Sequence, residues 1–156
     1  MPQTLADDSF AFPGMVPEGT GAKAHHSPLF RYPWQQASSA VAVAPVGKDG
    51  ARRVRYANPL DGGPVMFSLD CYVLELQGGQ DTIPFRTSAN AVYCVIDGEG
   101  QSHIGDQKMR WGPRDVFSAP RNNWIAHKSE GKARLFVTTD RDVLRRLDLL
   151  TEEWES

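Results

Sequence analysis

Cysteine is scarce in this sequence, and long apolar runs are missing. Its 156 residues include only two cysteines, Cys71 and Cys94, too few for the disulfide framework of a small secreted domain. No apolar run approaches the roughly 18 residues that a membrane-spanning helix needs, and the N-terminus has no basic patch followed by an apolar core. We therefore expect a cytoplasmic protein with reduced thiols, no signal peptide and no membrane association.

An excess of charge of one sign is missing as well. The formal net charge is -2 and the isoelectric point is near 6.1, so no broad basic surface is predicted and nucleic acid is a poor partner. Histidine is rare, with four residues in the chain, which limits sites built from imidazole ligands. A hydrophobic content of 40% over 156 residues suits one soluble domain with its own core.

Short β-strand patterns separated by turn residues fill the middle of the chain. Apolar and polar residues alternate, and clusters of Gly, Pro, Asn and Asp interrupt them about every ten residues. Strands are expected at 41–44, 52–57, 65–76, 91–96, 101–104, 108–111, 116–117, 124–127 and 135–138. This pattern is typical of an all-β sandwich or barrel, which we place at residues 30–139.

The two ends of the chain lack this pattern. Residues 1–29 are rich in Pro and Gly and have no sustained period, which predicts an extended N-terminal arm. Its Phe10, Phe12 and Met15 either dock onto the barrel or a neighbouring subunit, or belong to a mobile tail. Residues 140–156 carry apolar side chains at helical spacing and predict one amphipathic C-terminal α-helix across the barrel. These side chains are Val143, Leu144, Leu147, Leu150 and Trp154.

Two segments, 79–98 and 114–129, have the glycine and proline spacing of the paired motifs of a cupin barrel. The first motif runs from Gly79 to Gly98 without a gap, and the second aligns on Pro120. In this frame the chain resembles the cupin superfamily, which implies a single jelly-roll barrel. From about residue 30 to 150 the chain also resembles the C-terminal half of gentisate 1,2-dioxygenases. That resemblance rests on 30–34, 58–66, 91–93, 98–100, 115–117, Trp111, Pro120 and Trp124.

The metal ligands of the cupin frame are missing from this chain. Gentisate dioxygenases use ferrous iron to open aromatic rings, chiefly in their N-terminal cupin, and the resemblance puts ligands at positions 85, 87, 91 and 125. Phe85, Thr87, Ala91 and Ile125 stand there, and only the weak hydroxyl of Thr87 has an electron pair to offer a metal. We therefore expect no metal and no cofactor, with Fe2+ as the alternative.

The candidate site residues follow from the same frame. His127 lies two residues after position 125, so strand alternation sends both side chains to one face. It is either a general acid or base or a histidine satisfied by a structural hydrogen bond, and Tyr93 is either a second catalytic group or part of the core. Contacts to a ligand are expected from Phe85, Thr87, Trp124, Ile125, Arg121 and Asn123, although Arg121 and Asn123 equally suit a turn.

Apolar residues at the ligand positions predict a dry pocket for a hydrophobic or aromatic molecule with a few polar anchors. The resemblance to gentisate dioxygenases implies a small aromatic or carboxylated ligand. The leading hypothesis is a metal-independent cupin that binds this molecule and acts on it by acid–base chemistry, as an isomerase, cyclase or lyase. One alternative is an iron(II)-dependent ring-cleaving dioxygenase. The other is a non-catalytic ligand-binding cupin or partner subunit. The resemblance and the apolar arm together predict a homodimer.

Overall fold

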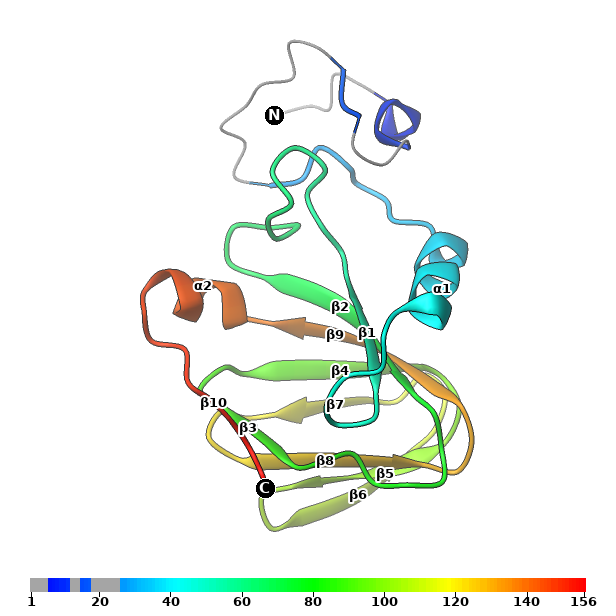
Figure 1. The fold of residues 1–156 in the computed structure, drawn as a ribbon, viewed down its shortest axis with the longest axis vertical. Helices are drawn as coiled ribbons and strands as arrows, with labels where there is room; N and C mark the ends of the chain where they lie inside the picture. Colours follow the sequence, from blue (N-terminus) through cyan, green and yellow to red (C-terminus); the bar gives the residue numbers. More distant parts are fainter. Residues whose placement is uncertain (1–5, 12–14, 18–25) are drawn as a thin grey trace.

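Two five-stranded antiparallel sheets form the body of the molecule (Figure 1). The computed structural model describes residues 6–11, 15–17 and 26–156. The first sheet has the order β1 (Arg52–Arg55), β2 (Asp70–Leu76), β9 (Ala133–Thr139), β4 (Ala91–Asp97) and β7 (Val116–Ala119). The second has the order β10 (Glu152–Trp154), β3 (Phe85–Thr87), β8 (Trp124–Ser129), β5 (Gly100–Ile104) and β6 (Gln107–Trp111). The predicted all-β fold is confirmed.

Alternate side chains of the strands fill the space between the sheets. In β8, Ile125, His127 and Ser129 are buried, whereas Trp124 and Lys128 face outward. This is the period of two that a half-buried strand requires, and it confirms that Ile125 and His127 share a face. One hydrophobic cluster joins both sheets and includes Leu74, Tyr93, Leu135, Val137, Ile104, Trp111 and Ile125.

The glycine positions of the cupin frame all adopt a left-handed backbone. The φ angles are 83° at Gly79 and 85° at Gly98, and the two glycine positions of the second motif have 76° at Arg114 and 65° at Asn122. At Gly98 a side chain is also excluded by space, because a Cβ atom would lie 2.5 Å from that of Ala133. The turns therefore keep the geometry of the frame even where glycine has been replaced.

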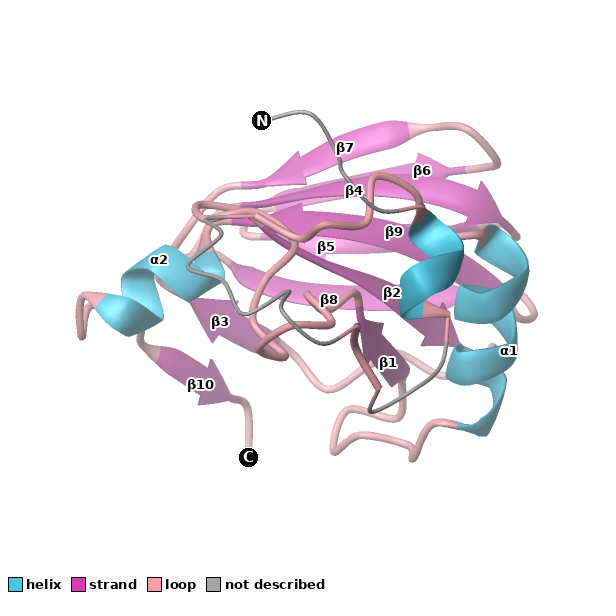
Figure 2. Cartoon of the chain, turned by 90° about the horizontal axis from the view of Figure 1, so that it is seen from above, coloured by secondary structure: helices cyan, strands magenta, loops and turns pink. Residues whose placement is uncertain are grey.

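Two of the expected strands are wrong in whole or in part. Residues 41–44 belong mostly to a helix, α1 (Trp34–Val43), which packs Ala37 and Val41 onto Val73 on the outer face of the first sheet (Figure 2). Ala37 and Val41 stand one helical turn apart, a signal that the short alternating run of valines concealed. The strand expected at 65–76 begins only at Asp70.

The predicted helix over 140–156 is wrong beyond residue 146. The segment begins as α2 (Arg141–Arg146), turns at Asp148 with a φ angle of 59°, and continues as the edge strand β10. β10 pairs with β3, and this pairing brings the Trp154 ring to 4.5 Å from the Phe85 ring. The hydrogen bonds and the ring contact outweigh the helical pattern. Among the described residues, no helix is long and apolar enough to cross a bilayer.

Parts of the N-terminal arm are described. A 3-10 helix, η1 (Asp7–Phe10), buries Phe10, whereas Met15 is 62% exposed. Phe12 lies outside the described residues, as does His25. His26 pairs with Met66 through an isolated β-bridge. The division of the chain into arm, barrel and C-terminal segment stays a prediction.

Candidate functional site

A pocket of about 270 Å³ lies inside the barrel and is lined by both sheets and by the C-terminal segment. The structure brings together five residues that the sequence predicted for the site: Phe85, Thr87, Tyr93, Ile125 and His127. They come from β3, β4 and β8, and the register places Phe85 opposite Ile125 across the β3–β8 pair. Strand alternation within one barrel therefore accounts for their convergence.

The positions of the cupin metal ligands form an apolar wall of this pocket. Phe85, Ala91 and Ile125 line it, and Trp154 covers Phe85 from the C-terminal strand. The Thr87 hydroxyl, the one polar group among the four, already accepts a hydrogen bond of 3.1 Å from the Ala89 amide. In residues 6–11, 15–17 and 26–156, no three His, Cys, Asp or Glu side chains gather to hold a metal ion.

His127 lines the pocket. We call His127, together with Ser102 and Trp111 behind it, the inner end of the pocket. His127 is 4% exposed, and its ring centroid lies 5.0 Å from that of Tyr93 and 6.3 Å from that of Phe117. Its main chain is held as well, because its amide donates to the Thr82 hydroxyl at 2.9 Å. The imidazole is therefore fixed within a largely aromatic environment.

The charge state of His127 follows from this environment. Burial lowers the pKa of His127 to about 4, and the positive charge of Arg53 acts in the same direction. A group with that pKa is neutral at pH 7, since desolvation disfavours its charged form. Burial likewise raises the pKa of the Tyr93 hydroxyl well above its ordinary value, and the Tyr72 phenol beside it adds to the rise. Both side chains therefore meet a ligand uncharged.

Charged side chains surround the opening of the pocket, which we call the mouth. It consists of three ion pairs: Arg53–Asp49, with an N–O distance of 2.8 Å, Arg55–Asp70 at 2.7 Å, and Arg141–Glu152 at 2.6 Å. The arginine side chains are 36%, 36% and 46% exposed. Because each arginine is paired with a carboxylate, the mouth offers N–H hydrogen-bond donors but has little net charge.

Arg53 and Asp49 are the most important residues of the pocket that sequence reasoning missed. The Asp49 side chain is only 2% exposed. Burial alone would raise the pKa of its carboxyl, but the hydrogen bonds and charge of Arg53 bring that pKa below its ordinary value. The alternating run at 52–55 marked Arg53 as a strand residue, but nothing local showed which face of the sheet it occupies.

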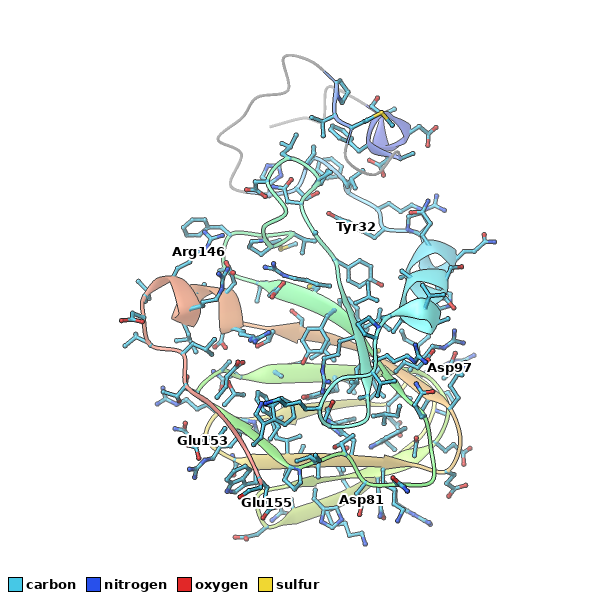
Figure 3. All side chains as sticks on the ribbon, viewed as in Figure 1. Tyr32, Asp81, Asp97, Arg146, Glu153 and Glu155 are labelled. Carbon is cyan, nitrogen blue, oxygen red and sulfur yellow. The ribbon has the colours of Figure 1, made fainter. Side chains whose placement is uncertain are left out.

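Three residues predicted for the site do not line the pocket. Trp124 faces outward, where the Arg86 guanidinium lies 4.8 Å from its ring. Arg121 is exposed, and the Asn123 side chain donates 3.0 Å to the Pro120 carbonyl, as a turn former does. Arg86 also pairs with Glu153 of β10 at 2.8 Å; Figure 3 labels Glu153. The loop 120–123 therefore shapes a turn and leaves the ligand contacts to the strands.

A larger cavity of about 620 Å³ lies outside the barrel. It is bounded by the segment 26–32 and by Tyr56, Cys71 and Phe136 on the outer face of the first sheet. Its walls are mainly apolar, and the Tyr32 and Ser27 hydroxyls that line it are already hydrogen-bonded to each other at 2.6 Å. We therefore assign the candidate site to the smaller pocket, where buried polar groups converge.

Comparisons with known proteins agree with this architecture. No protein-family model matches the chain. A 5-aminosalicylate 1,2-dioxygenase from Comamonas sp. is 35% identical over 132 residues, which cover 81% of this chain and 35% of the relative. A gentisate 1,2-dioxygenase 1 from Aquipseudomonas alcaligenes is 28% identical over 142 residues, which cover 88% of this chain and 41% of the relative. The chain thus spans less than half the length of these relatives.

Solved structures support the same fold. A salicylate 1,2-dioxygenase from Pseudoaminobacter salicylatoxidans superimposes with a TM-score of 0.89 at 23% identity, over 96% of this chain and 43% of that chain. A cupin 2 domain-containing protein from Halorhodospira halophila gives a TM-score of 0.51 at 17% identity, over 60% of this chain and 66% of that chain. The fold is therefore that of a cupin. Within the cupins, this chain resembles the C-terminal half of the gentisate 1,2-dioxygenases, as the sequence predicted.

The expectation of a protein without a cofactor is wrong. The gentisate-type relatives are iron-dependent dioxygenases, so a metal-free protein is not supported. The residues at the ligand positions of this barrel nevertheless do not fit an iron ion, because Phe85, Ala91 and Ile125 have no electron pair to donate. Iron chemistry is therefore not assigned to this pocket.

Proposed function

We propose that the barrel pocket binds a small aromatic carboxylate. The observation that carries this proposal is the combination of an apolar wall, an arginine at the mouth and an uncharged histidine at the inner end, all lining one cavity. Apolar walls with a few polar anchors are typical of small-molecule sites. The relatives named above act on aromatic acids according to their names, which favours the same class of ligand.

The size of the pocket limits the ligand to about one ring. Sites for drug-sized molecules occupy roughly 300 to 1,000 Å³, and the cavity of about 270 Å³ lies just below that range. The facing side chains Phe85, Ile125 and Trp154 offer flat or branched apolar surface to an aromatic face. A single substituted ring therefore fits better than a fused or extended system.

Arg53 is the proposed anchor for the carboxylate. A guanidinium has five N–H groups, and Asp49 accepts one hydrogen bond from each terminal nitrogen of Arg53. Three N–H groups stay available for a second carboxylate. Arg binds carboxylates in a planar fork that Lys cannot reproduce, so the contact gives orientation as well as attraction.

The geometry favours binding over an acid–base reaction. A histidine with a pKa of about 4 is a weak proton acceptor at pH 7, whereas an efficient general base has a pKa near the working pH. Tyr93 holds its proton for the same reason of burial. An isomerase, cyclase or lyase step by His127 thus has less physical support than a hydrogen-bonded complex.

A second candidate is participation in aromatic ring cleavage, because the relatives are named as ring dioxygenases. Oxygen uptake that depends on an aromatic acid, together with bound iron after purification under reducing conditions, would support it. Protein that binds aromatic acids but consumes no oxygen when supplied with ferrous iron would exclude it.

Binding is tested by titrating benzoate and salicylate into the protein and following tryptophan fluorescence, since Trp154 borders the pocket. Arg53→Lys keeps the charge that neutralises Asp49 but loses the fork, so we expect about tenfold weaker binding. The matched control is Arg110→Lys on β6, an exposed arginine outside the pocket, which should bind as the wild type does. Equal affinities in the two variants would refute the anchor, and no saturable binding would refute the site.

We also propose a homodimer. Exposed apolar side chains line the outer cavity beside the segment 26–32, with Phe30 66% and Met66 54% exposed, and such surface favours association. Light scattering at micromolar concentration is expected to give twice the chain mass, and a monomer would refute it. A cytoplasmic location stays a prediction based on the two cysteines, which are free thiols.

A further inference from the structure

A chain of hydrogen bonds runs from the core to the inner end of the pocket. The Trp111 indole nitrogen lies 2.8 Å from the Ser102 hydroxyl oxygen, and that oxygen lies 2.7 Å from Nδ1 of His127. Ser102 is 0% exposed and Trp111 is 4% exposed. The antiparallel pairing of β5 with β8 sets Ser102 directly opposite His127, so the contact is built into the sheet.

The direction of these hydrogen bonds follows from donor chemistry. An indole N–H only donates, so the Ser102 oxygen accepts from Trp111. The Ser102 hydroxyl hydrogen then needs an acceptor, and among the described residues Nδ1 of His127 is the atom within reach. If Nδ1 carried a hydrogen instead, the hydroxyl hydrogen of a fully buried serine would be left without a partner. That arrangement is disfavoured by roughly tenfold or more.

The other ring nitrogen of His127 faces the pocket. Three side-chain atoms of the described residues are fully enclosed and make no hydrogen bond: Glu75 Oε2, Ser129 Oγ and Asp142 Oδ2. Nε2 of His127 makes no hydrogen bond within the described part of the chain. Because it is not among these enclosed atoms, it is open to the pocket. Since His127 lines the pocket, Nε2 is the atom that a ligand would meet.

We infer that Ser102, oriented by Trp111, is a positioning residue that holds His127 as the Nε2–H tautomer, so that the inner end of the pocket selects a ligand with a hydrogen-bond acceptor there. The tautomer stands on the hydrogen-bond geometry alone, whereas the ligand preference rests on the proposed function. A pocket with donors at both ends, Arg53 at the mouth and His127 inside, accepts an aromatic carboxylate whose second substituent bears an acceptor oxygen.

The tautomer is tested by 15N NMR of the imidazole nitrogens in the full chain at pH 7, without ligand. We expect a protonated Nε2 and an unprotonated Nδ1 for His127, with less than about a tenth of the other tautomer. Exposed His103 on β5 serves as the internal reference. In Ser102→Ala, the Nδ1 resonance should move because its donor is lost, and the Nδ1–H tautomer should become detectable. A protonated Nδ1 in the wild type, or unchanged His127 resonances in Ser102→Ala, overturns the inference.

The ligand preference is tested with two probes of nearly equal shape. A methoxybenzoate presents an acceptor oxygen, and a (methylamino)benzoate presents an uncharged N–H donor at the same place. For the best positional isomer we expect the methoxy compound to bind about tenfold more tightly, and this ratio should fall in Ser102→Ala. Equal affinities, or an unchanged ratio in the variant, overturn the preference. Failure of benzoate itself to bind would instead refute the proposed function, while the NMR result on the tautomer would still stand.

Discussion

The two ends of the pocket are held together by different kinds of interaction. At the inner end, His127, Ser102 and Trp111 are almost completely buried and are joined by two short hydrogen bonds between uncharged groups. At the mouth, the arginines are more than a third exposed and are each paired with a carboxylate. Buried neutral hydrogen bonds are insensitive to salt and depend on exact packing, whereas exposed ion pairs are screened and tolerate movement. In the proposed complex, the inner end would therefore account for selectivity and the mouth for capture of the ligand.

The largest expected effect comes from removing the partner of the most buried carboxylate at the mouth. Arg53→Met leaves the Asp49 carboxylate, 2% exposed, without its partner. Unpaired buried charges cost about 3 to 5 kcal/mol, and the partial exposure of Arg53 favours the lower end, about 3 kcal/mol. Urea unfolding monitored by circular dichroism measures the loss. The double variant Asp49→Asn with Arg53→Met should recover most of it, and a loss below about 1 kcal/mol in the single variant would show that Asp49 is reached by solvent.

The second effect is the pH dependence of stability that His127 adds at the inner end. The folded-state pKa of His127, about 4, lies below its ordinary value of about 6.5. As the pH falls below 6.5, the unfolded chain takes up the proton first, so stability is lost progressively until the folded protein is protonated near pH 4. The full difference is up to about 3 kcal/mol. Unfolding free energies between pH 7 and 4 should therefore fall more steeply in the wild type than in His127→Gln.

The carboxylates of the protein also titrate in this range, so the informative quantity is the difference between the two slopes. His103→Gln on the neighbouring strand β5 is the matched control for replacing a histidine by glutamine, because His103 is exposed. Identical slopes in the wild type and His127→Gln would mean that folding does not lower the pKa of His127.

The smallest of the three effects tests the packing behind the inner end. At Gly100 a Cβ atom would lie 2.3 Å from the Lys128 carbonyl oxygen and 2.6 Å from the Trp111 ring. Gly100→Ala should therefore displace Trp111 and destabilise the fold by about 2 kcal/mol. Gly112→Ala is the control, since a Cβ atom there meets nothing within 4 Å. Thermal unfolding of both variants measures the difference. Equal melting temperatures would show that the Trp111 ring moves without loss of stability.

Much of the fold was accessible from local sequence patterns. Period-two alternation placed Ile125 and His127 on one face, and the glycine frame located turns that keep left-handed φ angles even at Arg114 and Asn122. Prediction from alternation failed where a strand period of two and a helical period of about 3.6 both fit a short segment. The valines of 41–44 alternate like a strand but lie in or next to α1, and the helical spacing up to Trp154 ends in an edge strand.

The site itself was only half predictable. Residues on the motif strands, such as Phe85 and His127, follow from the frame. Strands paired over long separations bring Arg53 to the pocket and Ser102 to His127, the latter two being 25 residues apart in sequence. No local signal distinguishes them from other strand residues. The loop residues Arg121 and Asn123 were predicted to contact a ligand but do not line the pocket. In sequence, polar residues that form a turn look the same as polar residues that bind a ligand.

The sequence by itself determined the barrel, its turns and the absence of metal ligands at positions 85, 91 and 125, because alternation, backbone conformation and residue chemistry are local properties. Only the tertiary structure decided that an arginine stands at the mouth, that His127 is uncharged, and that its Nδ1 is held by a serine that a tryptophan orients. Those properties depend on desolvation and on partners distant in the chain, and they exist only once the two sheets have closed over the pocket.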